Sequence, residues 1–224
     1  MSWSGGKDSA LALRALKASP EYAVVGLLTT VTDVYDRISI HGVRRQILVE
    51  QARALGLPLY ECRIPPNASN NQYEEAFLAA LGRAGTELDA RHIAFGDLFL
   101  EDVRAYRDRL MKRAEWTPLY PLWKKDTAAL AREFVSDGFK AILTCVDTTL
   151  LDARFAGREF DDALLAELPA TCDPCGERGE FHTCVYDAPI YQKPIELERG
   201  ELTPRDARFM YRDLLLTGTA KVVS

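Results

Sequence analysis

Hydrophobic residues along this chain follow two spacings, one typical of helices and one typical of buried strands. Residues 9–18 carry apolar side chains at helical spacing, whereas residues 23–31 form a short continuous run rich in β-branched residues. Both patterns recur through the first two thirds of the chain. They predict further helices at 43–55, 73–81, 103–114 and 127–134. They predict further strands at 57–62, 93–95 and 141–146.

Strands that alternate with helices are typical of parallel βαβ units. We therefore expect an α/β fold, with a doubly wound parallel sheet over residues 1–122. Only residues 1–3 precede the first polar loop, so the strand that leads into it is either very short or starts upstream. A proline- and aromatic-rich connector ends the alternation, and glycines and prolines punctuate residues 172–218. This change predicts a second, smaller α+β domain over residues 123–224.

Composition and charge narrow the class of protein. The 224 residues are 47% hydrophobic and 27% charged, as in an ordinary globular protein. No apolar run approaches the roughly 20 residues of a membrane-spanning helix, and no signal peptide is recognisable. The five cysteines are few and odd in number, which favours a reducing compartment and a cytoplasmic location. A net charge of -5 disfavours a large nucleic-acid surface.

The first polar loop, at residues 4–9, is the strongest chemical signal in the chain. Its residues are Ser4, Gly5, Gly6, Lys7, Asp8 and Ser9. Two glycines let the backbone turn with its N–H groups inward, Lys7 adds a positive charge, and a helix begins near Asp8. Such a turn predicts a phosphate site. The spacing differs from the ordinary phosphate loop of kinases and GTPases, and it resembles the PP-loop of ATP pyrophosphatases.

Polar residues also stand at the predicted carboxyl ends of two strands, where ligands bind in parallel sheets. Thr29 and Gly96-Asp97 occupy these positions and are expected to meet the loop around a nucleotide. Mg²⁺ bound with phosphates takes one or two carboxylates, for which Asp8 and Asp97 are candidates. Asp8 could equally serve only as the helix cap. His41, just before a predicted helix, is a further nucleotide-site candidate, or a capping or packing residue.

A second dense cluster lies at residues 172–183. Glycines predict a tight turn beside Glu177, and if residues 180–187 form a strand, Glu180 and His182 share one face. A carboxylate beside an imidazole suits proton transfer near neutral pH, although a solvated turn and an edge strand would look similar. Cys172 and Cys175 form a C-x-x-C pair that leaves packing, metal and redox roles open.

The motifs together resemble the diphthine–ammonia ligase family of ATP pyrophosphatases. The resemblance rests on five segments, which occur in the same order along the chain. They are the loop at 4–9, Ile40-His41, Phe95-Gly96-Asp97, Pro121-Leu122-Trp123 and Cys175-Gly-Glu-Arg-Gly-Glu-Phe-His-Thr183. The resemblance implies a HUP-like nucleotide domain followed by a smaller domain that carries the 175–183 segment. It also implies that ATP is split to AMP and pyrophosphate while ammonia amidates the carboxylate of diphthine, a modified histidine of a translation elongation factor. An unknown small molecule is the alternative acceptor.

The expected roles follow from that chemistry. Lys7, the loop serines and the loop amides would stabilise the departing pyrophosphate, and Glu177, Glu180 or His182 would take the proton that ammonium must lose.

A PP-loop enzyme that modifies tRNA and a non-catalytic adenine nucleotide sensor are the competing hypotheses. The basic run at 101–115 is read as a solvated helix face or as a guide for an acidic partner. The sequence leaves the oligomeric state open, a homodimer included.

Overall fold

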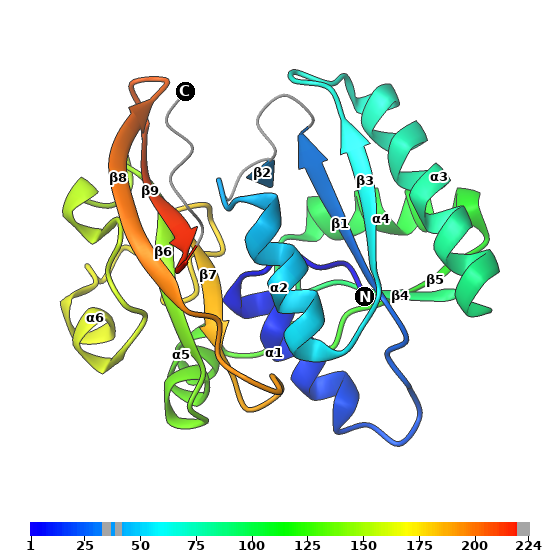
Figure 1. Cartoon of the computed structure of the whole chain (residues 1–224), viewed down its shortest axis with the longest axis horizontal. Coiled ribbons are helices and arrows are strands. Elements are labelled where there is room, and N and C mark those ends of the chain that lie inside the picture. Colours follow the sequence, from blue (N-terminus) through cyan, green and yellow to red (C-terminus); the bar gives the residue numbers. More distant parts are fainter. Residues whose placement is uncertain (33–36, 39–41, 219–224) are drawn as a thin grey trace.

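The computed structural model describes residues 1–32, 37–38 and 42–218, which form two adjoining mixed α/β parts (Figure 1). The first part contains α1 (Lys7–Lys17), β1 (Leu27–Thr32), β2 (Arg37–Ile38), α2 (Arg45–Leu55), β3 (Leu59–Ile64), α3 (Asn70–Leu88), β4 (His92–Ala94), α4 (Glu101–Ala114) and β5 (Thr117–Leu119). The second contains α5 (Thr127–Ser136), β6 (Lys140–Asp147), the 3-10 turn η1 (Ala153–Phe155), α6 (Asp162–Glu167), β7 (Phe181–Asp187), β8 (Leu197–Arg205) and β9 (Phe209–Leu216). Within the described ranges, no helix is long and apolar enough to cross a membrane.

Residues 1–3 join the two sheets of the first part, which are parallel apart from the short β2, paired antiparallel with β1. β1 pairs in parallel with β3, and β4 pairs in parallel with β5. Between these pairs, the Leu28 N–H donates to the Met1 carbonyl and the Leu28 carbonyl accepts from Trp3 N, each at 2.8 Å. Ser2 N donates to the Ala94 carbonyl at 2.8 Å. Residues 1–3 therefore lie between β1 and β4, directly before the loop.

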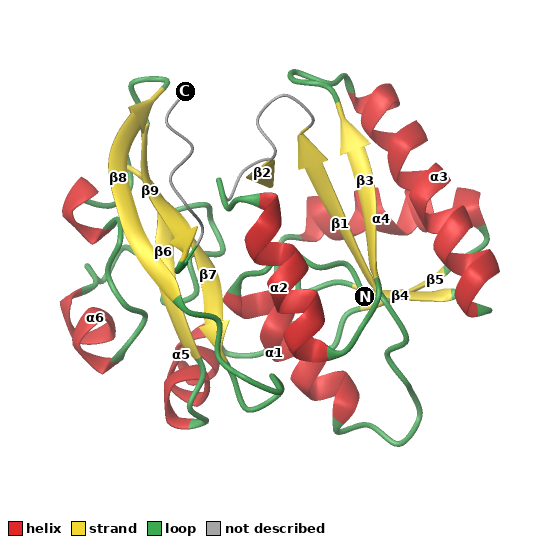
Figure 2. Cartoon of the chain, viewed as in Figure 1, coloured by secondary structure: helices red, strands yellow, loops and turns green. Residues whose placement is uncertain are grey.

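Helices pack against both faces of this sheet (Figure 2). Leu27 and Leu28 are neighbours in β1, so their side chains point to opposite faces. Leu27 belongs to a buried cluster that includes Leu11 of α1, whereas Leu28 belongs to a different cluster with Phe77 of α3 and Leu110 of α4. The predicted alternation of strands and helices thus produces a sheet that is covered on both sides.

The second part is built on an antiparallel sheet with the order β7-β6-β9-β8. The strand predicted at 141–146 is present as β6, and the conditional strand at 180–187 is present as β7. β8 and β9 were not predicted, because most side chains of β8 are exposed and the segment lacks an apolar pattern. Pairing with β9, and not burial, holds β8 in place.

Several predicted boundaries shift for local reasons. β1 begins at Leu27 and not at residue 23. α3 begins earlier than predicted, because Ser69 and Gln72 form a reciprocal capping box, and it continues to Leu88. α2 ends at the predicted stop, Gly56, whose φ of 67° is the left-handed conformation that glycine favours. β5 was read as part of a connector, yet it pairs with β4.

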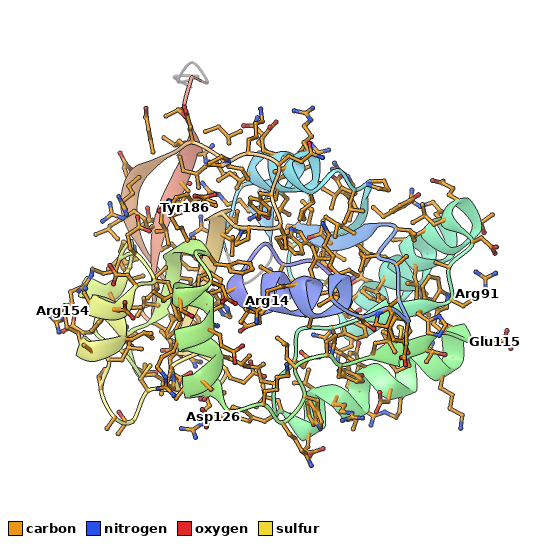
Figure 3. The ribbon with its side chains drawn as sticks, turned by 90° about the horizontal axis from the view of Figure 1, so that it is seen from below. Arg14, Arg91, Glu115, Asp126, Arg154 and Tyr186 are labelled. Carbon is orange, nitrogen blue, oxygen red and sulfur yellow. The ribbon has the colours of Figure 1, made fainter. Side chains whose placement is uncertain are left out.

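The two parts share one hydrophobic cluster. Leu48 of α2, Phe134 of α5 and Val185 of β7 all belong to it, so the core continues from one part into the other. On its rim, Arg14 of α1 forms an ion pair with Glu133 of α5 at 3.1 Å. Figure 3 shows Arg14 on the side of α1 that adjoins α5. Apolar contact and surface charge therefore both hold α1 against the second part.

A buried amide connects the polar loop to both parts. The Gln51 side chain of α2 is fully buried, and its Oε1 accepts a hydrogen bond from Trp3 Nε1 at 2.9 Å. Its Nε2 donates to the carbonyls of Gly5 at 3.0 Å and Val185 at 2.7 Å. Gly5 has a φ of 78°, and a Cβ there would lie 2.5 Å from Gln51 Oε1. The close approach of this amide requires glycine at position 5.

Replacing Gln51 with leucine should strongly destabilise the protein. The variant keeps the approximate side-chain volume but leaves one N–H group and two carbonyls without this partner, at about 1–3 kcal/mol for each buried group that stays unsatisfied. Urea unfolding measures the loss, and Gln46→Leu on the exposed side of the same helix is the control. Equal stability of the two variants would contradict the role assigned to Gln51.

Candidate active site

The polar loop forms a tight turn at the start of α1. Its side chains bond within the loop: Ser9 Oγ donates to the Gly6 carbonyl at 2.8 Å, and Gly6 N donates to Ser4 Oγ at 3.3 Å. α1 begins at Lys7 with Gly6 as its N-cap, so Asp8 lies in the first turn and does not cap the helix. The helix N-terminus leaves backbone N–H groups for a ligand and favours negative charge there.

Strand β7 holds this loop from the second part of the chain. The Thr183 hydroxyl accepts a hydrogen bond from Lys7 N at 3.0 Å, and Val185 N donates to the Gly5 carbonyl at 2.9 Å. Both β7 residues lie in or next to the second motif predicted from the sequence. The two strongest motifs, more than 160 residues apart in the chain, are therefore in direct contact.

Lys7 is buried and already compensated by negative groups. Its side chain is 2% exposed, and Nζ lies 2.9 Å from both carboxylate oxygens of Asp8. Nζ also donates to the Cys175 carbonyl, and it lies 5.9 Å and 5.5 Å from the ring centres of Phe160 and Phe181. Burial is the largest single influence and acts to lower the pKa of Lys7, but the Asp8 charge, the hydrogen bond to Asp8 and the nearby acidic groups of Cys175 and Glu177 together outweigh it, so the pKa is raised. The ammonium group therefore remains charged inside the protein.

A cavity of about 220 Å³ lies between the loop and the second motif. We call it the loop cavity. Of the residues predicted for the nucleotide or for catalysis, those that line it are Ser4, Lys7, Asp8, Ser9, Gly96, Asp97, Glu177 and His182. Gly5 and Gly6 build the turn without lining the cavity. His41 lies outside the described residues.

Gly96 lets the end of β4 approach the loop closely. A Cβ on Gly96 would lie 2.9 Å from the Asp8 backbone carbon and 3.1 Å from Ser9 N. Backbone atoms do not move aside as a flexible side chain would, so only glycine fits this contact. The predicted convergence of the β4 end and the loop is present in the structure.

Glu177 lines the cavity from the turn of the second motif. One of its oxygens accepts a hydrogen bond from Leu98 N at 2.9 Å, which ties the second motif to the turn after β4. Burial raises the pKa of Glu177 to about 7, and the nearby Asp8 charge adds to this effect. A carboxyl group with that pKa exchanges its proton near neutral pH.

Glu180 and His182, which were predicted to share one strand face, lie in different surroundings. Glu180 is buried outside the cavity, and its carboxylate accepts hydrogen bonds from Asp173 N at 2.8 Å and Arg178 N at 3.0 Å. Those bonds shape the turn that carries Glu177. His182 lies in β7 opposite Cys145, and it lines the cavity. Of the three residues predicted for proton transfer, Glu177 and His182 therefore line the cavity, whereas Glu180 supports the turn.

Arg107 of α4 was not predicted as a site residue, because the sequence places it in a run typical of a solvated helix face. Its Nε lies 2.6 Å from Asp97 Oδ2, and its Nη2 donates to Asp97 Oδ1 at 3.1 Å. Burial raises the pKa of Asp97, although Arg107 acts against the rise. The spacing of charges along α4 contained no signal that distinguished Arg107 from its exposed neighbours.

A second cavity, of about 570 Å³, lies at the carboxyl ends of β1 and β3. We call it the threonine cavity, because Thr29, Thr30 and Thr32 line it together with Tyr73. Thr29 is 2% exposed, and its hydroxyl has no hydrogen-bond partner among the described residues. A buried hydroxyl without a partner is a ready donor or acceptor for a bound molecule. Thr29 therefore lies in this second cavity and not in the loop cavity.

The cysteines of the second motif lie in the buried core cluster. Cys172 and Cys175 are buried and free, and burial raises the pKa of each thiol to about 12. Cys175 Sγ donates to the Thr127 carbonyl at 3.3 Å. Within the described ranges, no three metal-ligating side chains gather in one place. Protonated, buried thiols favour the packing role that the sequence left open.

Comparison with known proteins agrees with this geometry. Residues 1–116 match the family model of the diphthamide synthase N-terminal domain, and residues 126–212 match that of the diphthamide synthase C-terminal domain. The chain therefore belongs to the diphthamide synthase family, and the resemblance predicted from its motifs is confirmed.

The relatives that the chain resembles are named as ligases. It is 27% identical to the diphthine–ammonia ligase of Danio rerio over 218 residues, which cover 88% of the chain and 85% of the relative. It is 25% identical to that of Homo sapiens over 91% of the chain and 84% of the relative. The match to that of Schizosaccharomyces pombe, at 28% identity, covers 89% of the chain but 36% of the relative. The predicted enzyme class, an amide-forming ligase, is the class of these relatives.

The raised pKa of Glu177 predicts a pH-dependent stability. Between about 4.5 and about 7 the folded protein binds more protons at this group than the unfolded chain does. The free energy of unfolding should therefore fall as the pH rises through this range, and Glu177→Gln should remove that part of the fall. Urea unfolding at several pH values between 5 and 8 measures it, with exposed Glu75→Gln as the control. Parallel pH profiles for wild type and Glu177→Gln would contradict the shift.

Burial of all five cysteines predicts slow thiol labelling. An aromatic disulfide reagent should label fewer than one thiol per native chain within minutes and all five after unfolding in urea, because buried protonated thiols are unreactive. Rapid labelling of Cys172 or Cys175 in the native protein would show an accessible thiolate and favour a redox role.

Proposed function

We propose that this chain is an ATP-dependent ligase that forms AMP and pyrophosphate, adenylates a carboxylate and amidates it with ammonia. The main observation behind the proposal is that residues of both motifs line the loop cavity together. Membership of the diphthamide synthase family and the names of the relatives support the same chemistry. The diphthine of a translation elongation factor is the proposed acceptor, and a small carboxylate is the alternative.

We also propose a division of the chain into two domains. We assign residues 1–122 to a doubly wound, HUP-like PP-loop domain and residues 123–224 to a smaller substrate domain. The helices on both faces of the first sheet support the former, and the antiparallel sheet of the second part supports the latter. The shared core makes these two parts a single packed body in which the site lies at the junction. We expect the enzyme to act in the cytoplasm.

In this mechanism the loop holds the β- and γ-phosphates of ATP. The acceptor carboxylate attacks the α-phosphorus, the bond to the bridging oxygen breaks, and pyrophosphate leaves. Lys7, the serine hydroxyls and the N–H groups at the start of α1 stabilise the charge that develops on pyrophosphate. Because Lys7 is paired with Asp8 in this structure, a bound phosphate would share or replace that partner.

The second half-reaction uses the acyl-adenylate as the electrophile. Ammonia attacks the acyl carbon, AMP leaves, and the amide forms. Ammonium must first lose a proton, and Glu177, with a pKa of about 7, is the proposed acceptor, with His182 beside the same cavity.

Of the two carboxylates predicted to bind Mg²⁺, one is accessible to an ion and the other is paired with an arginine. The Asp8 side chain is 31% exposed and lines the loop cavity, so it is accessible to an ion bound with the phosphates. The Asp97 side chain is 14% exposed and faces Arg107 through both oxygens, so we propose Asp8 and not Asp97 as the protein ligand. When bound, the ion would offset the negative charge of the phosphates.

An assay with α-labelled ATP tests the proposal directly. Incubation with MgCl₂, ammonium and an elongation factor prepared from cells that lack their own diphthine–ammonia ligase should give AMP and pyrophosphate. Omission of either ammonium or the acceptor should abolish amide formation. Turnover that depends on RNA would favour the tRNA-modifying hypothesis, and binding without turnover would favour the sensor. ADP and orthophosphate as products would overturn the proposal.

Lys7→Ala should lower the rate of AMP formation about 10²–10³-fold, because the ammonium group stabilises charge in the transition state. Lys7→Met keeps more of the buried volume and should show the same loss if folding of the alanine variant is impaired. Lys17→Ala, on the exposed last turn of the same helix, is the matched control. An unchanged rate in a folded Lys7 variant would contradict the role of the loop.

A further inference from the structure

The loop cavity and the threonine cavity meet at a small set of shared residues. Ser2, Ser4 and Arg107 line both cavities, and Arg107 is the only cationic residue among these three. We propose that Arg107 binds the α-phosphate of the nucleotide, the group at which adenylation takes place. This inference rests on the proposed function and adds a catalytic residue to it.

The order of groups in ATP explains why the α-phosphate belongs at this boundary. The outer two phosphates bind at the helix N-terminus in the loop cavity, where Lys7 lies. The larger threonine cavity, with its unpartnered Thr29 hydroxyl and the ring of Tyr73, suits the adenosine. Because the α-phosphate joins these two parts of the ligand, it falls where the cavities meet.

The cations that line the loop cavity are each paired with a carboxylate. Lys7 is paired with Asp8 and Arg107 with Asp97, while Glu177 adds a further carboxyl group. A nucleotide triphosphate would bring several more negative charges into the same space. Arg107 is positioned to compensate them, and its planar fork matches two oxygens of one phosphate.

The contacts of Arg107 hold its guanidinium in place without completing its hydrogen bonds. The guanidinium carbon lies 4.2 Å from the centre of the Phe95 ring, which stacks in turn on Tyr120 at 5.8 Å. Arg107 Nε and Asp97 Oδ2 lie 2.6 Å apart, yet both are buried atoms without an aligned hydrogen bond in the described structure. The group is thus oriented by Phe95 and Asp97: its Nε and Nη2 face the Asp97 carboxylate, and its Nη1 side is the one that would bind an anion.

Asp97 is accordingly a positioning residue. It holds the fork of Arg107 at the boundary, and burial together with that contact explains why it is a poor ligand for an added ion. We keep Gly96 and Asp97 as residues of the nucleotide site, as predicted, but assign them other roles there. Gly96 permits the close approach to the loop, and Asp97 orients the cation that faces the reacting phosphate.

Three probes separate the α-phosphate from the rest of the nucleotide. Isothermal titration of the full chain with AMP, adenosine and inorganic pyrophosphate, each with MgCl₂, measures their binding to wild type, Arg107→Gln and Arg109→Gln. Arg109, exposed on the same helix, is the matched control. We expect Arg107→Gln to weaken AMP binding at least tenfold, while adenosine and pyrophosphate binding change less than twofold. Arg109→Gln should leave all three unchanged.

The other outcomes have distinct meanings. Equal weakening of AMP and adenosine would mark Arg107 as merely structural, and equal weakening of AMP and pyrophosphate would place it with the outer phosphates. Either result overturns the assignment, as does unchanged AMP binding. If wild type binds none of the probes, the proposed function itself fails. Arg107→Lys, which keeps the stem over Phe95 but loses the fork, repeats the test if the glutamine variant does not fold.

Discussion

The structure depends on satisfying the backbone of a buried phosphate-type loop. A turn that presents N–H groups to a ligand directs its carbonyls inward, where each needs a donor. The Gly5 carbonyl receives one hydrogen bond from the Gln51 amide and another from Val185 N. These partners come from α2 and from β7, so the loop takes its shape only when the two parts of the chain are packed together. The site is consequently a property of their junction.

The same junction sets the electrostatics of the site. Lys7 is buried among aromatic rings and remains charged because Asp8 lies beside it. Glu177 is brought close to both by the second motif, and burial there raises its pKa into the neutral range. On the opposite wall, Arg107 is restrained by Asp97 and Phe95. Cations and carboxyl groups thus balance locally, and a polyanionic ligand would change that balance at each of these residues.

Elements with a strong apolar pattern were predicted well, and elements held by pairing were not. The helices around Leu11 and Leu48 and the strand at 141–146 bury regular apolar faces, so their spacing is visible in the sequence. β8 has almost no buried side chains, and its existence depends on β9. Arg107 was likewise indistinguishable from other basic residues of α4, since only its contact with Asp97 sets it apart.

The sequence by itself determined the family and the two motifs that meet in the cavity, because glycine, lysine and carboxylate at fixed spacing express local backbone and charge requirements. Tertiary structure decided which carboxylates face that cavity. Glu177 faces it, whereas Glu180, three residues away, is turned into its own backbone by hydrogen bonds to Asp173 and Arg178. Side-chain direction in a turn depends on bonds formed after packing, so no spacing rule along the chain could have distinguished the two.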